Sequence, residues 1–111
     1  MEIQEQRHGA VTVLKPQGAL IHEDTEQFRD KVESARGKSF GRIVVDISSV
    51  PYVDSSGLEA LVEITEQFSH SGNALKLCGV NETVREVLDL TDLTSLFEYF
   101  EDINAAVRSY L

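Results

Sequence analysis

Asp54, Ser55 and Ser56 are three consecutive polar residues that stand between a β-branched run and a segment with helical periodicity. Residues of these types accept hydrogen bonds from the free N–H groups at the start of a helix, and Ser56 with Glu59 matches the capping-box pattern. One such residue is enough to cap a helix. Because three stand together, we expect this point in the chain to have a role beyond capping.

A serine hydroxyl at the start of a helix is also well placed to carry a phosphate group. The unpaired N–H groups and the positive end of the helix dipole favour negative charge there. Phosphorylation adds a charge of about −1.5 to −2 at pH 7, and it would stand beside Asp54 and near Glu59. Gly57 lowers helix propensity by about 1 kcal/mol relative to alanine. We therefore expect a partner or a neighbouring backbone to approach closely at Gly57.

Other kinds of reactive site lack the residues that they need. His8, His22 and His70 are far apart, and none has a second ligand at metal-binding spacing, so we expect no metal ion. The glycine-rich phosphate loops and the G-x-S-x-G nucleophile elbow do not occur. Cys78 stands alone in a short apolar run, which is typical of a small buried side chain. We expect no catalytic residue and no cofactor, and we favour a binding or signalling module over an enzyme.

Length and charge narrow the class of partner. The chain has 111 residues, the size of one domain spanning 1–111, with 10 basic and 19 acidic residues and a net charge of −9. A protein that binds nucleic acid without sequence specificity needs a surplus of Lys and Arg, and so does one that binds an anionic membrane surface. No segment has the character of a membrane span or a signal peptide. A cytoplasmic protein is therefore expected, without membrane insertion and without nucleic acid as its partner.

The negative charge is concentrated in the second half of the chain. Residues 1–53 hold 8 acidic and 7 basic residues, whereas residues 54–111 hold 11 acidic and 3 basic residues. In the helix expected after Asp54, the acidic side chains fall opposite the apolar stripe on a helical wheel; they are Glu59, Glu63 and Glu66. If that side faces solvent, the docking surface is acidic and its partner presents Lys or Arg.

Hydrophobic periodicity predicts strands and helices in the order β-β-α-β-α-β-α-β-α. Gly37 is a stop signal for the first helix, residues 71–73 for the second, and Asn81 is an N-cap for the third. Strands that alternate with helices pair in parallel, so we expect an α/β fold with one mostly parallel mixed sheet and helices packed on it. The predicted strands are 3–8, 11–18, 42–47, 75–80 and 96–100, and the predicted helices are 23–36, a segment that follows 54–57 and ends near residue 70, 82–90 and 103–111.

Residues 42–58, RIVVDISSVPYVDSSGL, resemble the signature of the STAS domain. Within that family the chain is most similar to the bacterial anti-sigma factor antagonists. An Asp-Ser-Ser-Gly-Leu run after a β-branched strand is specific, whereas a bare Asp-Ser-Ser is not. The resemblance implies a single STAS-type domain over residues 1–111, and further matches extend it over essentially the whole chain: 18–20, 77–80, 84–93 and 96–97.

The resemblance implies a phosphorylation switch. An unphosphorylated antagonist of this family binds an anti-sigma factor that is also a serine kinase of the histidine-kinase-like ATPase fold, which frees a sigma factor for transcription. The kinase phosphorylates the serine after the aspartate, which corresponds to Ser55, and a metal-dependent serine phosphatase resets the released form. Asp54 matches the aspartate that supports the serine and the partner contact, and Ser56 is implied to act as a cap or hydrogen-bonding partner. The residues alone do not distinguish Ser55 from Ser56, since both lie at the same helix start.

Two positions depart from the family's pattern, and two other functions remain open. Glu59 stands where small residues are common, so it could alter kinase recognition or mark a different partner, and Asn81-Glu82 replaces a proline-containing start. The first alternative is a STAS module of another cytoplasmic assembly, such as a stressosome-type scaffold or a lipid-transport accessory subunit. The second is a sensor of a small ligand or nucleotide that uses the same loop. The implied partner-binding residues are Asp54, Ser55, Ser56, Gly57, Leu58 and Glu59.

Overall fold

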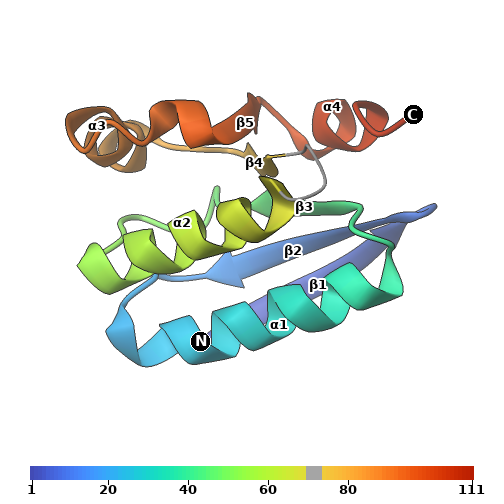
Figure 1. The fold of residues 1–111 in the computed structure, drawn as a ribbon, viewed down its shortest axis with the longest axis horizontal. Coiled ribbons are helices and arrows are strands. Elements are labelled where there is room, and N and C mark those ends of the chain that lie inside the picture. Colours follow the sequence, from blue (N-terminus) through green and yellow to red (C-terminus); the bar gives the residue numbers. More distant parts are fainter. Residues whose placement is uncertain (70–73) are drawn as a thin grey trace.

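The computed structural model describes residues 1–69 and 74–111, except for the side chain of Ser69. Within these residues the centre of the molecule is a five-stranded mixed sheet whose strands lie in sequence order (Figure 1). β1 pairs antiparallel with β2, and the later neighbours pair in parallel. The strands are β1 (Glu2–His8), β2 (Val11–Gln17), β3 (Ile43–Asp46), β4 (Leu75–Cys78) and β5 (Phe97–Phe100).

Helices connect the parallel strands and cover both faces of the sheet. Three of them pack on one face, where Figure 1 shows α1 and α2 side by side, and α4 covers part of the other face. Two short 3₁₀ turns precede α1 and β5. The predicted order of strands and helices is therefore confirmed. The bounds are η1 (His22–Asp24), α1 (Thr25–Lys38), α2 (Ser55–Ser69), α3 (Glu82–Leu90), η2 (Thr94–Leu96) and α4 (Ile103–Arg108).

The central strands are buried because both of their faces are covered. Every residue of β3 and β4 is buried. On β3, Ile43 and Val45 join the main core under α1 and α2, whereas Val44 packs with Ala106 of α4 on the opposite face. A β-branched strand that is apolar on both faces predicts this central position. β1 pairs on one side only and is mostly exposed, as predicted for an edge strand.

The first helix begins and ends later than predicted. It begins at Thr25 because residues 22–24 form η1, and it continues through Gly37. It ends where the N–H of Gly41 donates to the carbonyl of Arg36 at 3.0 Å, and Gly41 adopts a φ of +81°. The stop predicted at Gly37 was wrong, because the helix is terminated by Phe40, which adopts the left-handed conformation with a φ of +52° and is followed by Gly41.

Several other elements are shorter than predicted. β4 ends at Cys78 because Gly79 turns the chain with a φ of +70°. Leu96 belongs to η2, so β5 begins at Phe97. The predicted end of the second helix near residue 70 and its stop at 71–73 lie outside the described residues. Among the helices of the described residues, none has the length and apolar character needed to cross a membrane.

Candidate functional site

Asp54 is the residue that caps α2. Its Oδ1 accepts a hydrogen bond from the N–H of Gly57 at 2.8 Å, and its Oδ2 accepts one from the N–H of His22 at 3.0 Å. The bond from Gly57 is the main cause that holds the pKa of Asp54 below its usual value, although desolvation acts in the opposite direction. Asp54 is therefore ionised at neutral pH, and it ties the start of α2 to the loop before α1.

The two serines at the start of α2 lie in different surroundings. Ser56 is half-buried, and its Oγ lies 3.2 Å from Nδ1 of His22, so its hydroxyl is held in a hydrogen bond. Ser55 is exposed, and its hydroxyl has no hydrogen-bond partner among the described residues. The capping box predicted from Ser56 and Glu59 was wrong, because Asp54 takes the capping position. Ser55 is thus the more accessible of the two hydroxyl groups.

Gly57 is buried where the start of α2 meets the loop after β2. A Cβ atom at this position would lie 2.2 Å from the carbonyl oxygen of Leu20. The same carbonyl accepts a hydrogen bond from the N–H of Asp54 at 3.2 Å, and Leu20 forms a parallel bridge with Val53. The close approach predicted at Gly57 is therefore made by a neighbouring backbone. Gly57 supports the site from inside and does not form its surface.

His22 is a site residue that the sequence patterns did not indicate. It lies in the loop after β2, where its backbone N–H bonds Asp54 and its ring contacts Ser56. The carboxyl ends of parallel strands meet at one edge of a sheet, and binding loops gather at such an edge. The predicted parallel sheet is a signal that the loops after its strands gather at one end, and the structure pairs β2 with β3. The sequence signal does not tell which side chain makes the contact.

Asn81 connects a third loop to the site. Its Oδ1 accepts a hydrogen bond from the N–H of Val84 at 2.8 Å, which confirms the predicted N-cap of α3. Its Nδ2 donates to the carbonyl of Val50 at 3.0 Å, in the segment between β3 and α2. The departure from the family's pattern at Asn81 thus supplies a side-chain amide that steadies the loop leading to Asp54.

The acidic side of α2 is not a uniform surface. Glu59 and Glu66 are exposed. Glu63 forms an ion pair with Arg29 of α1, in which Nε and Oε2 are 2.9 Å apart. The acidic row predicted along this helix is therefore interrupted, because the carboxylate of Glu63 binds the neighbouring helix.

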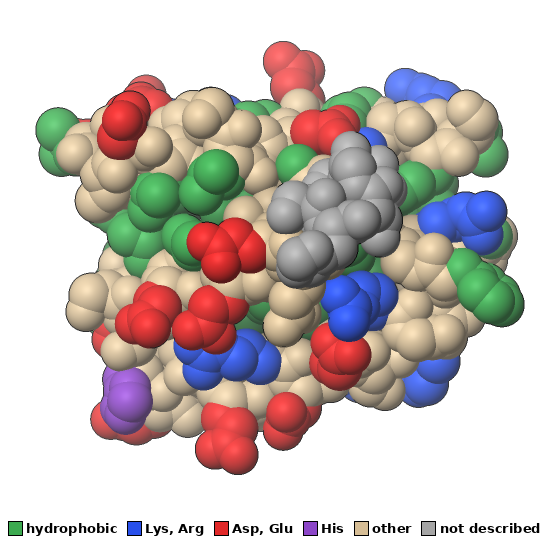
Figure 2. Space-filling model, in the orientation of Figure 1, with side chains coloured by type: hydrophobic (Ala, Val, Ile, Leu, Met, Phe, Trp, Pro, Cys, Tyr) green, Lys and Arg blue, Asp and Glu red, His purple; other side chains and the backbone are tan. Residues whose placement is uncertain are grey.

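Apolar side chains of α2 and α3 reach the surface. Leu58, about one turn after Ser55, is half-buried, and Leu90 at the end of α3 is 79% exposed. Figure 2 shows a group of apolar side chains between α2 and α3, with acidic side chains around it. A partner that docks at Ser55 would thus meet an apolar surface with an acidic surround.

Cys78 is buried at the end of β4, as predicted for a lone cysteine in an apolar run. Burial, together with the neighbouring Asp46 carboxylate, raises the pKa of its thiol to about 12. The thiol is therefore protonated at neutral pH and is a poor nucleophile. The described residues also contain no cluster of three or more side chains arranged to bind a metal ion.

Known proteins resemble this chain over most of its length. Residues 2–106 match the STAS domain. The anti-sigma F factor antagonist of Paenibacillus polymyxa is 23% identical over 107 residues, which cover 95% of this chain and 92% of that protein. A Thermotoga maritima protein provisionally named an anti-sigma factor antagonist is 31% identical over 99 residues, which cover 88% of each chain.

Solved structures share the fold. The crystal structure of a Thermotoga maritima protein with the same provisional name has a TM-score of 0.86 at 28% identity, and the match covers 96% of this chain and 92% of that chain. The antagonist SpoIIAA in its unphosphorylated form has a TM-score of 0.76 at 21% identity, with 98% of this chain and 96% of that chain covered. The chain therefore belongs to the STAS domain family, in the group of the anti-sigma factor antagonists.

Proposed function

We propose that the chain is a regulator that acts by partner switching through Ser55. In its unphosphorylated form it binds an anti-sigma factor that is also a serine kinase, and this frees a sigma factor in the cytoplasm. Phosphorylation of Ser55 releases it, and a metal-dependent serine phosphatase restores the binding form. The proposal rests on one observation above all: within the described residues, the Ser55 hydroxyl is exposed and without a hydrogen-bond partner at a firmly capped helix start.

Ser55 suits the role of phosphate acceptor better than Ser56 does. A kinase must align the attacking hydroxyl oxygen with the γ-phosphate of ATP, so the oxygen must be accessible. The hydroxyl of Ser56 is half-buried and bonded to the ring of His22. Modification there would break that bond and force a doubly charged group between the start of α2 and the turn that holds His22. At Ser55 the phosphate would project into solvent.

A phosphate on Ser55 would change the docking surface without unfolding α2. The helix N-terminus favours negative charge, while the carboxylate of Asp54 adds a like charge beside it. Release would follow because a doubly charged group would have to be desolvated against the apolar surface at Leu58. SpoIIAA has been solved in unphosphorylated and phosphorylated forms, and the fold of this chain resembles both, with TM-scores of 0.76 and 0.70.

Binding of the cognate anti-sigma factor to three variants tests the proposal. Ser55→Ala is expected to bind like the unmodified protein and to resist release when ATP is added. Ser55→Asp is expected to bind at least about tenfold more weakly, a change of about 1.4 kcal/mol. Ser56→Ala is the matched control, because it removes a hydroxyl one residue away and should retain release by ATP.

Mass spectrometry after incubation with the kinase and ATP locates the modification. A single phosphate on Ser55, absent from Ser55→Ala, supports the proposal. Equal affinities of Ser55→Ala and Ser55→Asp for the anti-sigma factor would contradict it, and so would a phosphate found on Ser56 alone.

A further inference from the structure

A pocket of about 720 Å³ lies at the amino-terminal end of the parallel strands, opposite to the end that carries Ser55. It is formed where α1 ends, where β3 and β4 begin, and where the chain leaves α4. Ser55 follows the carboxyl end of β3, so the two sites are separated by the length of the strand (Figure 1). The side chains that give the pocket its character are three basic and three aromatic: Arg36, Arg42, Lys76, Phe40, Phe68 and Tyr110.

The pocket is basic in a chain whose net charge is −9. No Asp or Glu of the described residues lines it. Arg36 and Lys76 form ion pairs with Glu33 at 3.0 Å and Glu98 at 2.9 Å, but both carboxylates lie outside the lining. Arg42 is exposed and makes no ion pair with a described residue. Its guanidinium is therefore available to an anion.

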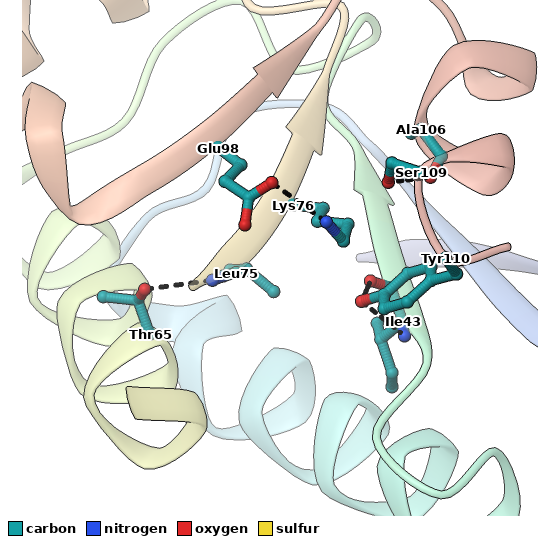
Figure 3. A network of polar contacts seen from close by, with 8 residues as sticks. All are labelled: Ile43, Thr65, Leu75, Lys76, Glu98, Ala106, Ser109 and Tyr110. Atoms are coloured by element: carbon teal, nitrogen blue, oxygen red, sulfur yellow. Dashed lines mark hydrogen bonds and ion pairs between the residues drawn. The ribbon is translucent and has the colours of Figure 1, made fainter. Parts of the chain in front are cut away.

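One wall of the pocket is held rigidly. The hydroxyl of Tyr110 donates to the carbonyl of Ile43 at 2.7 Å and accepts from the N–H of the same residue at 3.2 Å. Nζ of Lys76 lies 4.7 Å from the centre of the Tyr110 ring, within the range of a cation–π interaction. Figure 3 shows the ring of Tyr110 between the start of β3 and Lys76. The ring is thus fixed in place before any ligand arrives.

At the end of α1, the glycine at position 37 and the exposed ring of Phe40 are not required by packing within the described residues. Gly37 is helical, and a Cβ atom there would meet nothing within 4 Å. Glycine weakens a helix relative to alanine, so an unfilled position in the last turn has a cost without a local benefit. The backbone of Phe40, with a φ of +52°, is accounted for because this residue terminates α1, but its ring is 88% exposed and has no packing role within the described residues. A ligand between them would use the space at Gly37 and cover the ring of Phe40.

We propose that this pocket binds a small aromatic anion, a ring that carries a phosphate or carboxylate group. Guanidinium groups bind such oxyanions through paired hydrogen bonds, and Arg42 supplies one beside Arg36, which is held by Glu33 and by the ring of Phe68. The aromatic body of the ligand would pack against Phe40 and Tyr110. The volume falls in the range of about 300–1,000 Å³ that is usual for small-molecule sites. This site does not depend on the phosphorylation of Ser55.

An NMR titration of the ¹⁵N-labelled full chain tests the proposal, with phenyl phosphate and benzoate as probes. At least one of them is expected to give saturable shifts of the Gly37 and Gly41 amide signals, and the tighter one identifies the preferred anionic group. Inorganic phosphate and phenol carry only half of the proposed chemistry. Each is expected to bind at least about tenfold more weakly. Absence of saturable shifts with both probes, or equal binding of inorganic phosphate, would overturn the proposal.

Three variants separate the pocket from general charge effects. Arg42→Gln is expected to raise Kd about tenfold, the factor that corresponds to about 1.4 kcal/mol. Arg85→Gln removes the same charge from the start of α3, which follows the carboxyl end of β4, and should leave Kd unchanged. Gly37→Leu fills the open space with a better helix former, so it should abolish binding without lowering Tm. Equal weakening by the two arginine variants, or unaltered binding to folded Gly37→Leu, would contradict the assignment.

Discussion

A helix near each end of the sheet contains a glycine, and the surroundings of the two glycines are opposite. At the end that carries Ser55, a Cβ on Gly57 would lie 2.2 Å from the carbonyl oxygen of Leu20. At the other end, a Cβ on Gly37 would meet nothing within 4 Å. The intrinsic helix propensity of glycine is about 1 kcal/mol less favourable than that of alanine, so each position needs a reason. The first is required by a contact inside the molecule, whereas the second leaves space.

The polar groups of the two ends are also arranged differently. Around Ser55, side chains bond to backbone N–H and carbonyl groups of neighbouring loops, as Asp54 and Asn81 do. At the other end the cation of Lys76 lies over the rings of Phe100 and Tyr110. The first arrangement fixes three loops and leaves one hydroxyl exposed. The second surrounds a hollow with positive charge and aromatic faces. The fold thus offers a site for a covalent switch and a site for a ligand at opposite ends of one sheet.

The largest effect is expected from alanine at the two glycines. Gly57→Ala should lower the free energy of unfolding by about 3 kcal/mol, because the new methyl group collides with backbone that has little freedom to move. Gly37→Ala should raise it by about 1 kcal/mol. Urea denaturation of both variants measures the two values. Changes of the same sign would remove the contrast between the two ends.

A smaller effect is expected from Tyr110→Phe. The variant removes the hydroxyl that donates to the carbonyl of Ile43, while the N–H of Ile43 keeps its bond to the carbonyl of Gly41, so the loss should be about 1 kcal/mol of unfolding free energy. Burial raises the pKa of Tyr110 to about 12 from its usual value of 10.0. The unfolded chain therefore ionises first, so this stabilisation is complete below about pH 10 and is lost as the pH rises toward 12. Urea denaturation of wild type and Tyr110→Phe at pH 8 and pH 11 measures this loss. If the difference in unfolding free energy between the two proteins is the same at both pH values, ionisation of Tyr110 does not affect stability.

Asp54→Asn tests the other end and should change stability less than Tyr110→Phe, because asparagine is also a good N-cap. The pKa of Asp54 is lowered below its usual value of 3.8, mainly by the N–H of Gly57. The charged form is therefore favoured by folding. Its stabilisation is present above about pH 4 and is lost as the pH falls through the lowered pKa. The Tm of wild type and variant should differ at pH 7 and converge in strong acid. Parallel curves over the whole range would show that the charge has no part in capping.

Local signals explain why much of the fold could be predicted from the sequence. The β-branched run before Asp54 and the cap at Asn81 act within a few residues, so their patterns are visible in the chain itself. The stop was mispredicted at Gly37 because the residue that adopts the left-handed conformation at the end of the helix is Phe40, and phenylalanine is not a recognisable helix-stop signal in a sequence. The contact of His22 with Ser56 joins the short turn before α1 to the start of α2, 34 residues further along the chain. Only the packing of the strands determines such a contact.

The Arg29–Glu63 ion pair has the same origin, and it leads to the smallest expected effect, on the rate of association with the anti-sigma factor. Glu59 is exposed, whereas the charge of Glu63 is already partly neutralised by Arg29. If the partner is basic, Glu59→Gln should slow association at low salt more than Glu63→Gln does.

Glu63→Gln is the matched control, since it removes the same charge and should instead lower the free energy of unfolding by about 0.5 kcal/mol, as expected for an exposed ion pair. Salt shortens the range of electrostatic attraction to about 8 Å at physiological ionic strength, so wild-type association should slow as salt is added and the two variants should converge with it. Stopped-flow kinetics measures these rates. If the association rate does not change with ionic strength, the acidic side chains do not guide recognition at Ser55. Recognition would then depend on the apolar surface at Leu58, because burial of apolar groups is not weakened by screening.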